Sequence, residues 1–300
     1  MIDVWHTLES AFPVVIGKMR GLDSDFPPHV IESVAGWQRL MDFMVFEDQA
    51  INGEIVTHQL QRRAYMNPIT IDQHFEALVQ AGYAEKHADG TFTVTDAGRD
   101  GYLDYFAQRT TAYQPVTLLP QAEFEQLIGF LQKGYEAAKH ADEPQNKPSM
   151  VLGHRFYTHV ADTGGQLGTL LGWINLFELY RDDVHAAIWR EAGFTGIRME
   201  VFTHVWHDEE HNARKLAEHL AHRGYNQSDY QAALDELVQF GLISTHDDYY
   251  TLTDEGREFR HALEEATNIM FQDFCIVTFS EDDLTNFAQI IDSLKNTESN

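Results

Sequence analysis

A long repeat constrains the fold of this chain more than any other feature of its sequence. The stretches 70–99 and 228–257 share one order of apolar, glycine and polar positions. Leu78 in the first stretch corresponds to Leu237 in the second, 159 residues later. A repeat of this period and length predicts an internal duplication rather than a solenoid of short repeats.

Each copy predicts an amphipathic helix, a tight stop, two short strands and the start of another helix. In the second copy, Ser228 or Asp229 is expected to cap the first amides of the helix, and Ser228 with Gln231 has the spacing of a capping box. Gly241 suits the positive-φ stop after that helix. Strands at 242–243 and 249–252 are expected around a polar tip.

The most informative segments of the repeat are ALVQAGY and FTVTDAGR in the first copy, and ELVQFGLI and YTLTDEGREFR in the second. Both copies resemble the winged-helix module of MarR-like bacterial regulators, roughly over 54–99 and 212–260. The resemblance implies two winged helices on one chain, as two chains carry them in a MarR-type dimer. It is more specific for the module than for its function, because winged helices also bind proteins.

The expected fold class is therefore mainly α with small β-wings, built from tandem winged-helix units flanked by long helices. A chain of 300 residues suits two domains of about 150. The polar, proline-containing stretch KHADEPQNKPS is the best candidate linker. We predict a first winged-helix half over 1–140, a linker over 141–149 and a second winged-helix half over 150–300.

The composition limits the cellular environment and the kinds of partner that the sequence predicts. The formal net charge is −26, which disfavours nucleic acid unless the basic residues cluster, although such a surface also serves solubility or a salty cytoplasm. Cys275 is the single cysteine, so no internal disulfide is expected, as suits a reducing cytoplasm. We expect a cytoplasmic protein with no signal peptide and no membrane segment.

The helices expected to read DNA are poor in cations. Neither 70–82 nor 228–241 contains a lysine or an arginine, although duplex affinity depends on cations at phosphates. The wings also lack the arginine that MarR-like proteins offer to the minor groove. The alternative for Arg63 and Arg223 is that each neutralises a helix C-terminus. The expected DNA contacts are Arg62, Arg63, Gln73, His74, Arg214, Lys215, Arg223 and Gln231.

Three glycines recur every four residues at 164, 168 and 172. Glycine inside a helix costs roughly 1 kcal/mol relative to alanine, so we expect another backbone to approach this face closely. A cavity wall that admits a ligand is the alternative. Gly168→Leu should then destabilise the fold by overpacking.

Aromatic and charged residues mix at helical spacing over 173–190, which is typical of a polar ligand pocket or of a layer of inter-helix salt bridges. The ligand-pocket candidates are Trp173, Asp182, His185, Trp189 and Arg190. His207 and His211 have the i,i+4 spacing of zinc ligands, with His204 nearby, although acidic residues beside them suit a helix N-terminus instead. We expect no metal and no cofactor.

No nucleophile elbow, phosphate-binding loop, dinucleotide fingerprint or paired-carboxylate signature occurs in the sequence, so we expect no catalytic residues. The resemblance favours a MarR-like transcriptional regulator that binds DNA through both winged helices, with control by a small-molecule effector. The alternative is a winged-helix module that binds a protein or ligand and has lost DNA contact. We expect a monomer or a homodimer.

Overall fold

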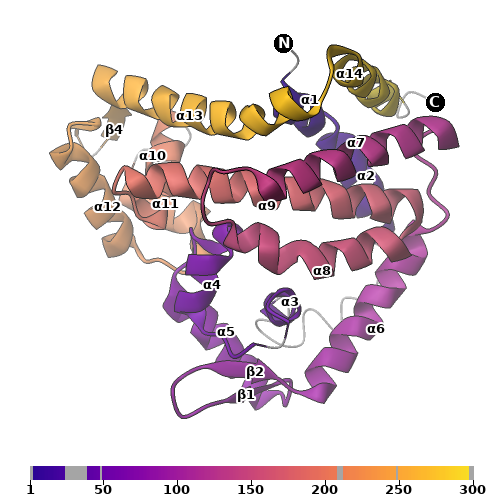
Figure 1. Ribbon diagram of the computed structural model, residues 1–300. Coiled ribbons are helices and arrows are strands. Elements are labelled where there is room, and N and C mark those ends of the chain that lie inside the picture. The colour runs from indigo at the N-terminus through magenta and orange to yellow at the C-terminus, as the bar shows by residue number, and fades with distance from the viewer. Residues whose placement is uncertain (1–2, 24–38, 48, 208–211, 248, 297–300) are drawn as a thin grey trace.

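The computed structural model describes residues 3–23, 39–47, 49–207, 212–247 and 249–296 (Figure 1). Long helices dominate it, and the described strands form two small antiparallel hairpins. The predicted class, mainly α with small β-wings, is confirmed. The helices of the body are α1 (Val4–Glu9), α2 (Phe12–Asp23), α6 (Asp96–Tyr113), α7 (Gln121–His140), α8 (Pro148–Thr163), α9 (Gly165–Glu191), α13 (Asp254–Thr278) and α14 (Glu281–Lys295).

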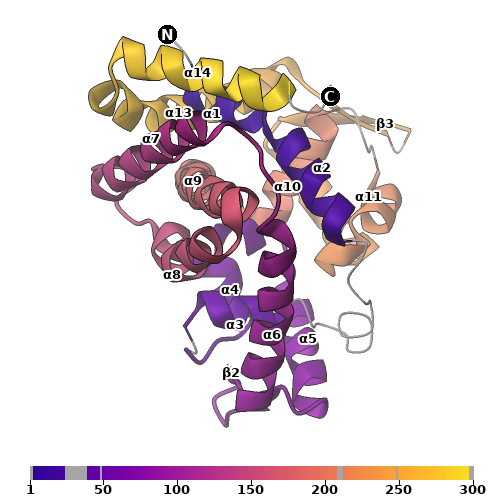
Figure 2. The same cartoon turned by 90° about the vertical axis from the view of Figure 1, so that its right-hand side faces the viewer.

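An antiparallel pair of helices, α8 and α9, forms the centre of the body. Helix α13 runs along α9 on the side away from α8, and α7 also packs on α9 (Figures 1 and 2). Helix α14 closes back on α7, where the ring of Phe130 stacks on Phe279 at 3.9 Å and on Phe287 at 4.2 Å between centroids. Ser280 caps α14 with Asp283 in a capping box.

The close packing expected at the glycines is confirmed between α8 and α9. A Cβ at Gly172 would lie 2.5 Å from the carbonyl oxygen of Tyr157, and one at Gly168 would lie 3.1 Å from that of Val160. The third glycine, Gly164, lies at the turn between the two helices rather than on the same helix face. The small residues thus let two backbones approach within one hairpin of helices.

The first small unit, which we name the first segment, spans 40–94. It contains α3 (Leu40–Val45), α4 (Gly53–Gln59), the 3₁₀ turn η3 (Gln61–Arg63), α5 (Pro68–Gln80), β1 (Ala84–Lys86) and β2 (Phe92–Val94). The strands pair antiparallel, with Ala84 opposite Val94. Side-chain oxygens of Asn52 and Asn67 cap α4 and α5.

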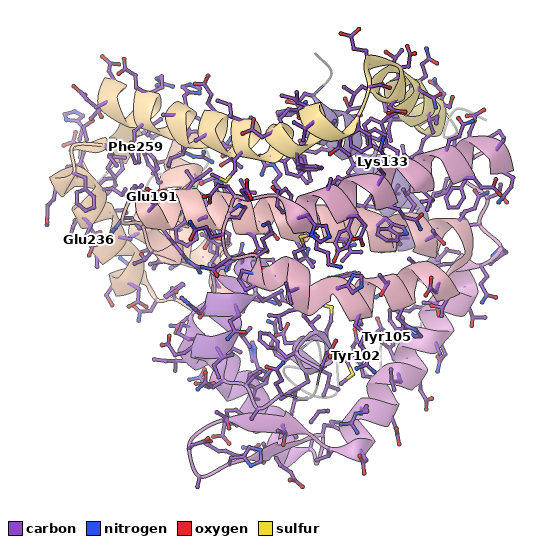
Figure 3. The ribbon with its side chains drawn as sticks, viewed as in Figure 1. Tyr102, Tyr105, Lys133, Glu191, Glu236 and Phe259 are labelled. Carbon is purple, nitrogen blue, oxygen red and sulfur yellow. The ribbon has the colours of Figure 1, made fainter. Side chains whose placement is uncertain are left out.

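The second small unit, the second segment, spans 196–252 and repeats this order. It contains α10 (Gly196–Trp206), α11 (Ala213–His219), η4 (Ala221–Arg223), α12 (Gln227–Gln239), β3 (Ile243–His246) and β4 (Tyr249–Leu252). Ile243 lies opposite Leu252 in its hairpin. Phe259 and Glu236 mark this end of the molecule in Figure 3.

The start of α12 differs from the prediction. Asn226, not Ser228, is the N-cap, and its capping box is closed by Asp229 rather than by Gln231. The Asn226 side chain accepts hydrogen bonds from the amides of Ser228 and Asp229, so the helix begins two residues earlier than Ser228 would allow. The cap therefore matches Asn67 of the first segment.

Both segments also end in the same local structure. Thr95 and Thr253 cap the helix after each hairpin, and each hydroxyl donates to the carbonyl of the preceding glycine stop, Gly82 or Gly241. Those two glycines have φ of +79° and +72°, a conformation that favours glycine. Hairpins and helix stops are therefore present at both predicted positions. The strand β3 covers Ile243–His246 rather than the expected 242–243, because the pairing with β4 extends to His246 opposite Tyr249.

Two hydrophobic cores hold the described chain together. The larger core draws on α1 to α9 together with α13 and α14, and so combines residues from both sides of 141–149. The smaller core belongs to the second segment and the ends of α9 and α13, with Trp189, Phe202 and Leu234 among its buried side chains. Residues 141–147 lie between α7 and α8, and the predicted linker and domain bounds stay a prediction. Within the described residues, no helix has the length and apolarity needed to cross a membrane.

Substitution of Gly172 tests the packing of α8 on α9. An alanine there forces the two helices apart, so we expect Gly172→Ala to lower the free energy of unfolding by about 1–3 kcal/mol. Gly129→Ala on α7 is the matched control, because nothing lies within 4 Å of a Cβ there. It should leave stability unchanged or raise it by up to ~1 kcal/mol. Equal urea-unfolding midpoints for the two variants would contradict this packing.

Candidate functional site

The starts of α5 and α12, the two helices expected to face DNA, lie at one junction. The amide of Asn67 donates to the carbonyl oxygen of Arg223 at 2.8 Å, and its side-chain amide donates to that of Gly224 at 3.2 Å. The Tyr225 hydroxyl donates to the carbonyl oxygen of Met66 at 3.1 Å. Gly224 has φ +80°, and a Cβ there would lie 2.1 Å from Thr70 Oγ1. The turn of each segment is therefore fixed against the other.

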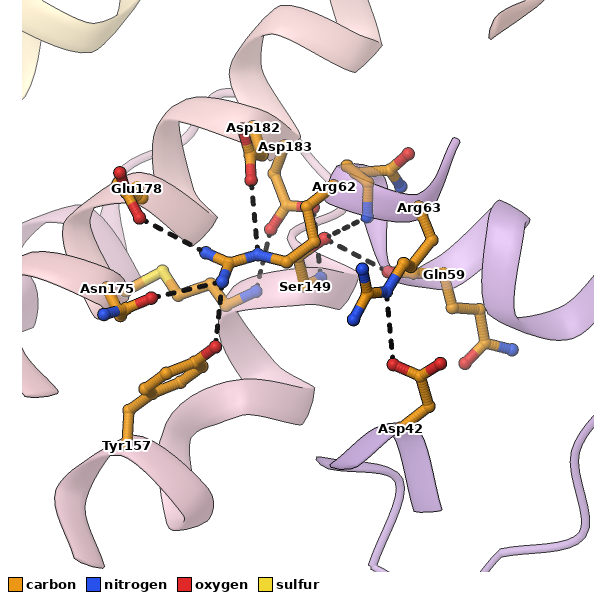
Figure 4. A network of polar contacts seen from close by, with 12 residues as sticks. Asp42, Gln59, Arg62, Arg63, Ser149, Tyr157, Asn175, Glu178, Asp182 and Asp183 are labelled. Atoms are coloured by element: carbon orange, nitrogen blue, oxygen red, sulfur yellow. Dashed lines mark hydrogen bonds and ion pairs between the residues drawn. The ribbon is translucent and has the colours of Figure 1, made fainter. Parts of the chain in front are cut away.

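In the first segment, the predicted cationic contacts point inward. Arg62 Nη1 donates to the Tyr157 hydroxyl at 2.8 Å and to Asn175 Oδ1 at 3.1 Å (Figure 4). Its other nitrogens lie 3.6 Å from Glu178 and 3.7 Å from Asp182. These contacts join the η3 turn to α8 and α9.

The neighbouring Arg63 is also held by a carboxylate, since its Nε lies 3.2 Å from Oδ1 of the fully buried Asp42 (Figure 4). Arg39 pairs with the other oxygen of Asp42 at 3.0 Å. The sequence offered Arg63 either to phosphate or to a helix terminus. The structure instead uses it to neutralise a buried acid on α3.

In the second segment, Arg223 has the equivalent structural role. Its Nε donates to Glu200 Oε1 at 2.7 Å, and its guanidinium lies 5.6 Å from the centroid of the Tyr65 ring. Glu200 is only 6% exposed, and burial raises its pKa while Arg223 opposes that rise. Arg223, the last residue of η4, therefore pairs with a buried carboxylate of α10.

Arg214 and Lys215 lie in a different setting, exposed on the first turn of α11. Arg214 is 65% exposed and pairs only loosely with Glu218 at 3.3 Å. Gln231 Nε2 donates to Asp235 and to the Tyr250 hydroxyl, both at 2.8 Å. Together with Gln227 and Asn212, Arg214, Gln231 and Tyr250 line a surface hollow between α11, α12 and the wing.

The two predicted contacts on α5 face different environments. Gln73 is exposed, whereas His74 is half-buried. Burial lowers the pKa of His74, and Arg39 lowers it further, which favours the neutral imidazole. The α5 surface thus offers the exposed amide side chains of Gln73 and Gln80 and no lysine or arginine.

The five ligand-pocket candidates are spread around α9 and do not converge. Trp173 contacts the ring of Tyr135 on α7, and Asp182 faces Arg62. His185 Nδ1 lies 3.1 Å from Thr267 Oγ1 on α13. Nine residues separate Trp173 from Asp182, which is two and a half turns and places them on opposite faces.

The other two candidates lie at the end of α9. Trp189 is buried against Tyr65, and Arg190 lies over the Trp189 ring and donates to backbone carbonyls of α4 at 3.4 Å. Arg190 also lines a hollow of about 610 Å³ with Gln61 and Asp183. Asp183 itself accepts hydrogen bonds from the first amides of α8, at Ser149 and Met150. Arg190 and Asp183 therefore join α9 to the first segment and to α8.

The histidine cluster does not form a metal site in the described part of the chain. No group of three or more His, Cys, Asp or Glu side chains there is placed to hold an ion. His204 contacts His219, and His207 caps α10. His211 lies outside the described residues.

A cavity that the sequence did not predict lies beside the Arg62 network. Its walls come from α2, α6, α8 and α9 and include Tyr102, Phe106 and Phe156. These aromatic positions recur at helical spacing and predict a core, so sequence periodicity cannot distinguish a filled interior from a lined cavity. Glu178, at the polar end, was also missed because its partner Arg62 is distant in sequence.

Burial of Glu178 raises its pKa to about 7, although Arg62 opposes the rise. The folded chain therefore holds this proton more tightly than the unfolded chain, where the ordinary value is 4.5. The resulting stabilisation is complete below about pH 4.5 and is lost as the pH rises through 7.

We expect the melting temperature of the wild type to fall relative to that of Glu178→Gln between pH 5 and pH 8, because glutamine stays neutral. Asp183, whose pKa burial also raises to about 7, titrates in both proteins and cancels in the comparison. Thermal unfolding at several pH values measures the difference. A difference that does not change with pH would show that Glu178 is already ionised throughout.

Removal of Arg223 should leave the buried Glu200 without its cation and cost about 3–5 kcal/mol of unfolding free energy. Adding Glu200→Gln should recover part of that loss. Arg214→Ala is the control and should change stability by no more than about 0.5 kcal/mol, because its ion pair is exposed. Urea unfolding measures all three variants, and equal losses for Arg223→Ala and Arg214→Ala would rule out the structural role.

Comparison with known proteins adds one finding to this geometry. No match was found among curated proteins or among solved structures. Residues 159–297 match the model of a helix-turn-helix family. The matched range begins within α8 and includes α9 to α14, and so contains the whole second segment. The match therefore supports a helix-turn-helix domain in the second half of the chain.

Proposed function

We propose that this protein is a DNA-binding regulator whose duplex contact is made mainly by the second segment. The observation that carries the proposal is that the helix-turn-helix match covers α11 and α12, the pair whose exposed surface keeps cations. Arg214 and Lys215 lie exposed on α11, and Arg214 lines one hollow with Gln227 and Gln231. Such a set combines phosphate contacts with groups that hydrogen-bond base edges.

The first segment plays a smaller part in this proposal. Arg62 and Arg63 are held by Asp182, Glu178 and Asp42, and withdrawing either arginine would remove a cation from carboxylates that are partly or fully buried. Gln73 remains available on α5, close to the junction with the second segment. We infer that the first segment orients the second and adds at most a few polar contacts.

The net charge sets the strength of the proposed binding. A chain with a formal charge of −26 is repelled by a duplex at long range, and few exposed cations oppose that repulsion. Attraction between Arg214, Lys215 and phosphates is screened less at low ionic strength. We therefore propose weak duplex binding that strengthens as the ionic strength falls.

We further propose that the protein is a MarR-like regulator. Its two winged-helix units would derive from a duplication, and a small ligand would control its DNA binding. Matched caps, glycine stops and wings support the duplication, since Asn67 and Asn226, and Thr95 and Thr253, occupy equivalent places. The contact between the two turns supports one chain acting as two chains do in a dimer.

A second candidate function is binding of a protein by the same surfaces. Ile69 on α5 is 65% exposed, and Phe240 at the end of α12 is 58% exposed. Exposed aromatic and large apolar side chains on helices that would face DNA are more typical of a protein interface. This candidate predicts no duplex binding even at low salt.

We expect the double variant Arg214→Ala/Lys215→Ala to weaken duplex binding and to reduce the slope of log K against log salt by about 0.9 for each lost phosphate contact. Arg155→Ala/Lys295→Ala is the matched control, because it removes the same charge from exposed positions on α8 and α14. Fluorescence anisotropy with a labelled duplex at several salt concentrations measures both slopes. Equal slopes in the two double variants would place the DNA surface elsewhere.

A further inference from the structure

A cavity of about 390 Å³ lies between α2, α6, α8 and α9 and is separate from the helix-turn-helix surface. Its volume falls within the range of about 300–1,000 Å³ that small-molecule sites occupy. Aliphatic side chains from α2 and α9 and methionines from α2 and α3 form part of the lining. The remaining lining is aromatic and polar, and the polar side chains include Arg62, Arg109, Asn175 and Glu178.

The aromatic walls are arranged to accept a flat molecule. Tyr102 and Phe106 on α6 lie nearly parallel, with 12° between their planes, and Phe156 on α8 lies 5.4 Å from Phe106 between centroids. Tyr102 and its neighbour Tyr105 lie beside α8 in Figure 3. The three rings contact one another at separations typical of aromatic pairs and so form one rigid wall, against which a flat ring can pack.

The polar end of the cavity offers hydrogen-bond donors. Tyr102 is 6% exposed, and no described residue forms a hydrogen bond with its hydroxyl. Arg62, which donates to Asn175, also lines the cavity, and its cation is balanced by Asp182 at 3.7 Å. Arg109 of α6 is a second cation in the lining, and its guanidinium lies over the rings of Tyr105 and Tyr113. The pKa of Glu178, about 7, leaves much of this carboxyl protonated near neutral pH, when it acts as a donor. An acceptor without net charge suits this end better than an ion does.

We propose that this cavity binds a small, uncharged, planar aromatic molecule that carries a carbonyl or similar acceptor oxygen at one end. The ring packs against the wall formed by Tyr102, Phe106 and Phe156, and the oxygen accepts from the Tyr102 hydroxyl. The inference names the ligand class for the small-ligand control proposed above. A regulatory role for this ligand rests on the proposed function, whereas binding of the ligand to the cavity does not.

The cavity is connected to a helix-turn-helix turn through one residue. Arg62 lines the cavity and belongs to η3, the turn between α4 and α5. The next turn of chain contacts Arg223 and Gly224 of the second segment. A ligand that shifts Arg62 therefore acts on the junction that orients α12.

Prodan, a neutral naphthalene with a ketone oxygen, is a suitable probe because its emission moves to shorter wavelength in an apolar site. Titration of the full chain without DNA should show saturable binding at one site per chain with that emission shift. Leu171→Trp on the cavity wall should abolish saturation by filling the space. Leu152→Trp, on α8 but outside the cavity lining, is the control and should bind as the wild type does.

Tyr102→Phe keeps the ring and removes only the hydroxyl, and should weaken prodan binding about threefold to tenfold, as loss of one hydrogen bond does. This variant keeps the test decisive if Leu171→Trp fails to fold. Non-saturable emission, or wild-type binding by both Leu171→Trp and Tyr102→Phe, would overturn the site. Tighter binding of the anionic anilinonaphthalene sulfonate than of prodan would overturn the uncharged ligand class.

A final comparison separates this inference from the proposed function. Prodan that saturates the cavity without changing duplex affinity leaves the binding site intact and removes ligand control from the proposed function. Duplex binding that persists while prodan fails to bind removes the ligand site and leaves the proposed DNA binding intact. The two failures are therefore distinguishable in one set of titrations.

Discussion

The guanidinium of Arg62 is the contact on which the arrangement of the first segment depends. It joins η3 to Tyr157 on α8 and to Asn175 and Glu178 on α9. A partly buried cation requires several well-placed partners to offset its lost hydration, so the turn is held in one position against the helical body. The same residue closes the polar end of the aromatic cavity.

The second constraint is the close approach of α8 and α9 at Gly168 and Gly172. Because the hairpin is tight, Tyr157 and Asn175 on facing helices reach one side chain between them (Figure 4). The α8–α9 hairpin thus holds both the first segment and the walls of the cavity in place. The second segment packs at the far end of α9 around Trp189.

Local sequence signals predicted much of the fold, because they depend on neighbouring residues. The two wings, the glycine stops and the Ser280 cap follow from short-range chemistry. The cap of α12 was misplaced because Asn226 and Ser228 are both good caps, and their choice depends on which one Asp229 reaches. The combination of α1 to α9 with α13 and α14 in one core depends on packing between distant helices, which no local pattern reports.

The roles of charged side chains were less predictable. Nothing in the sequence near Arg63 or Arg223 shows that each faces a buried carboxylate from another helix, Asp42 or Glu200. The position of Trp173 and Asp182 on opposite faces of α9 could have been predicted from the helical period alone. The cavity was not, because aromatic residues that line a space have the same spacing as those that fill one.

Hydrogen–deuterium exchange of the full chain with and without excess random duplex at low salt tests the central claim most directly. We predict that DNA slows amide exchange in α11 and the first turns of α12, from Ala213 to Tyr230, while α4 and α5 change little. Protection centred on α5, or no protection anywhere in the described chain under conditions where electrostatic attraction is strongest, would contradict the assignment of DNA contact to the second segment.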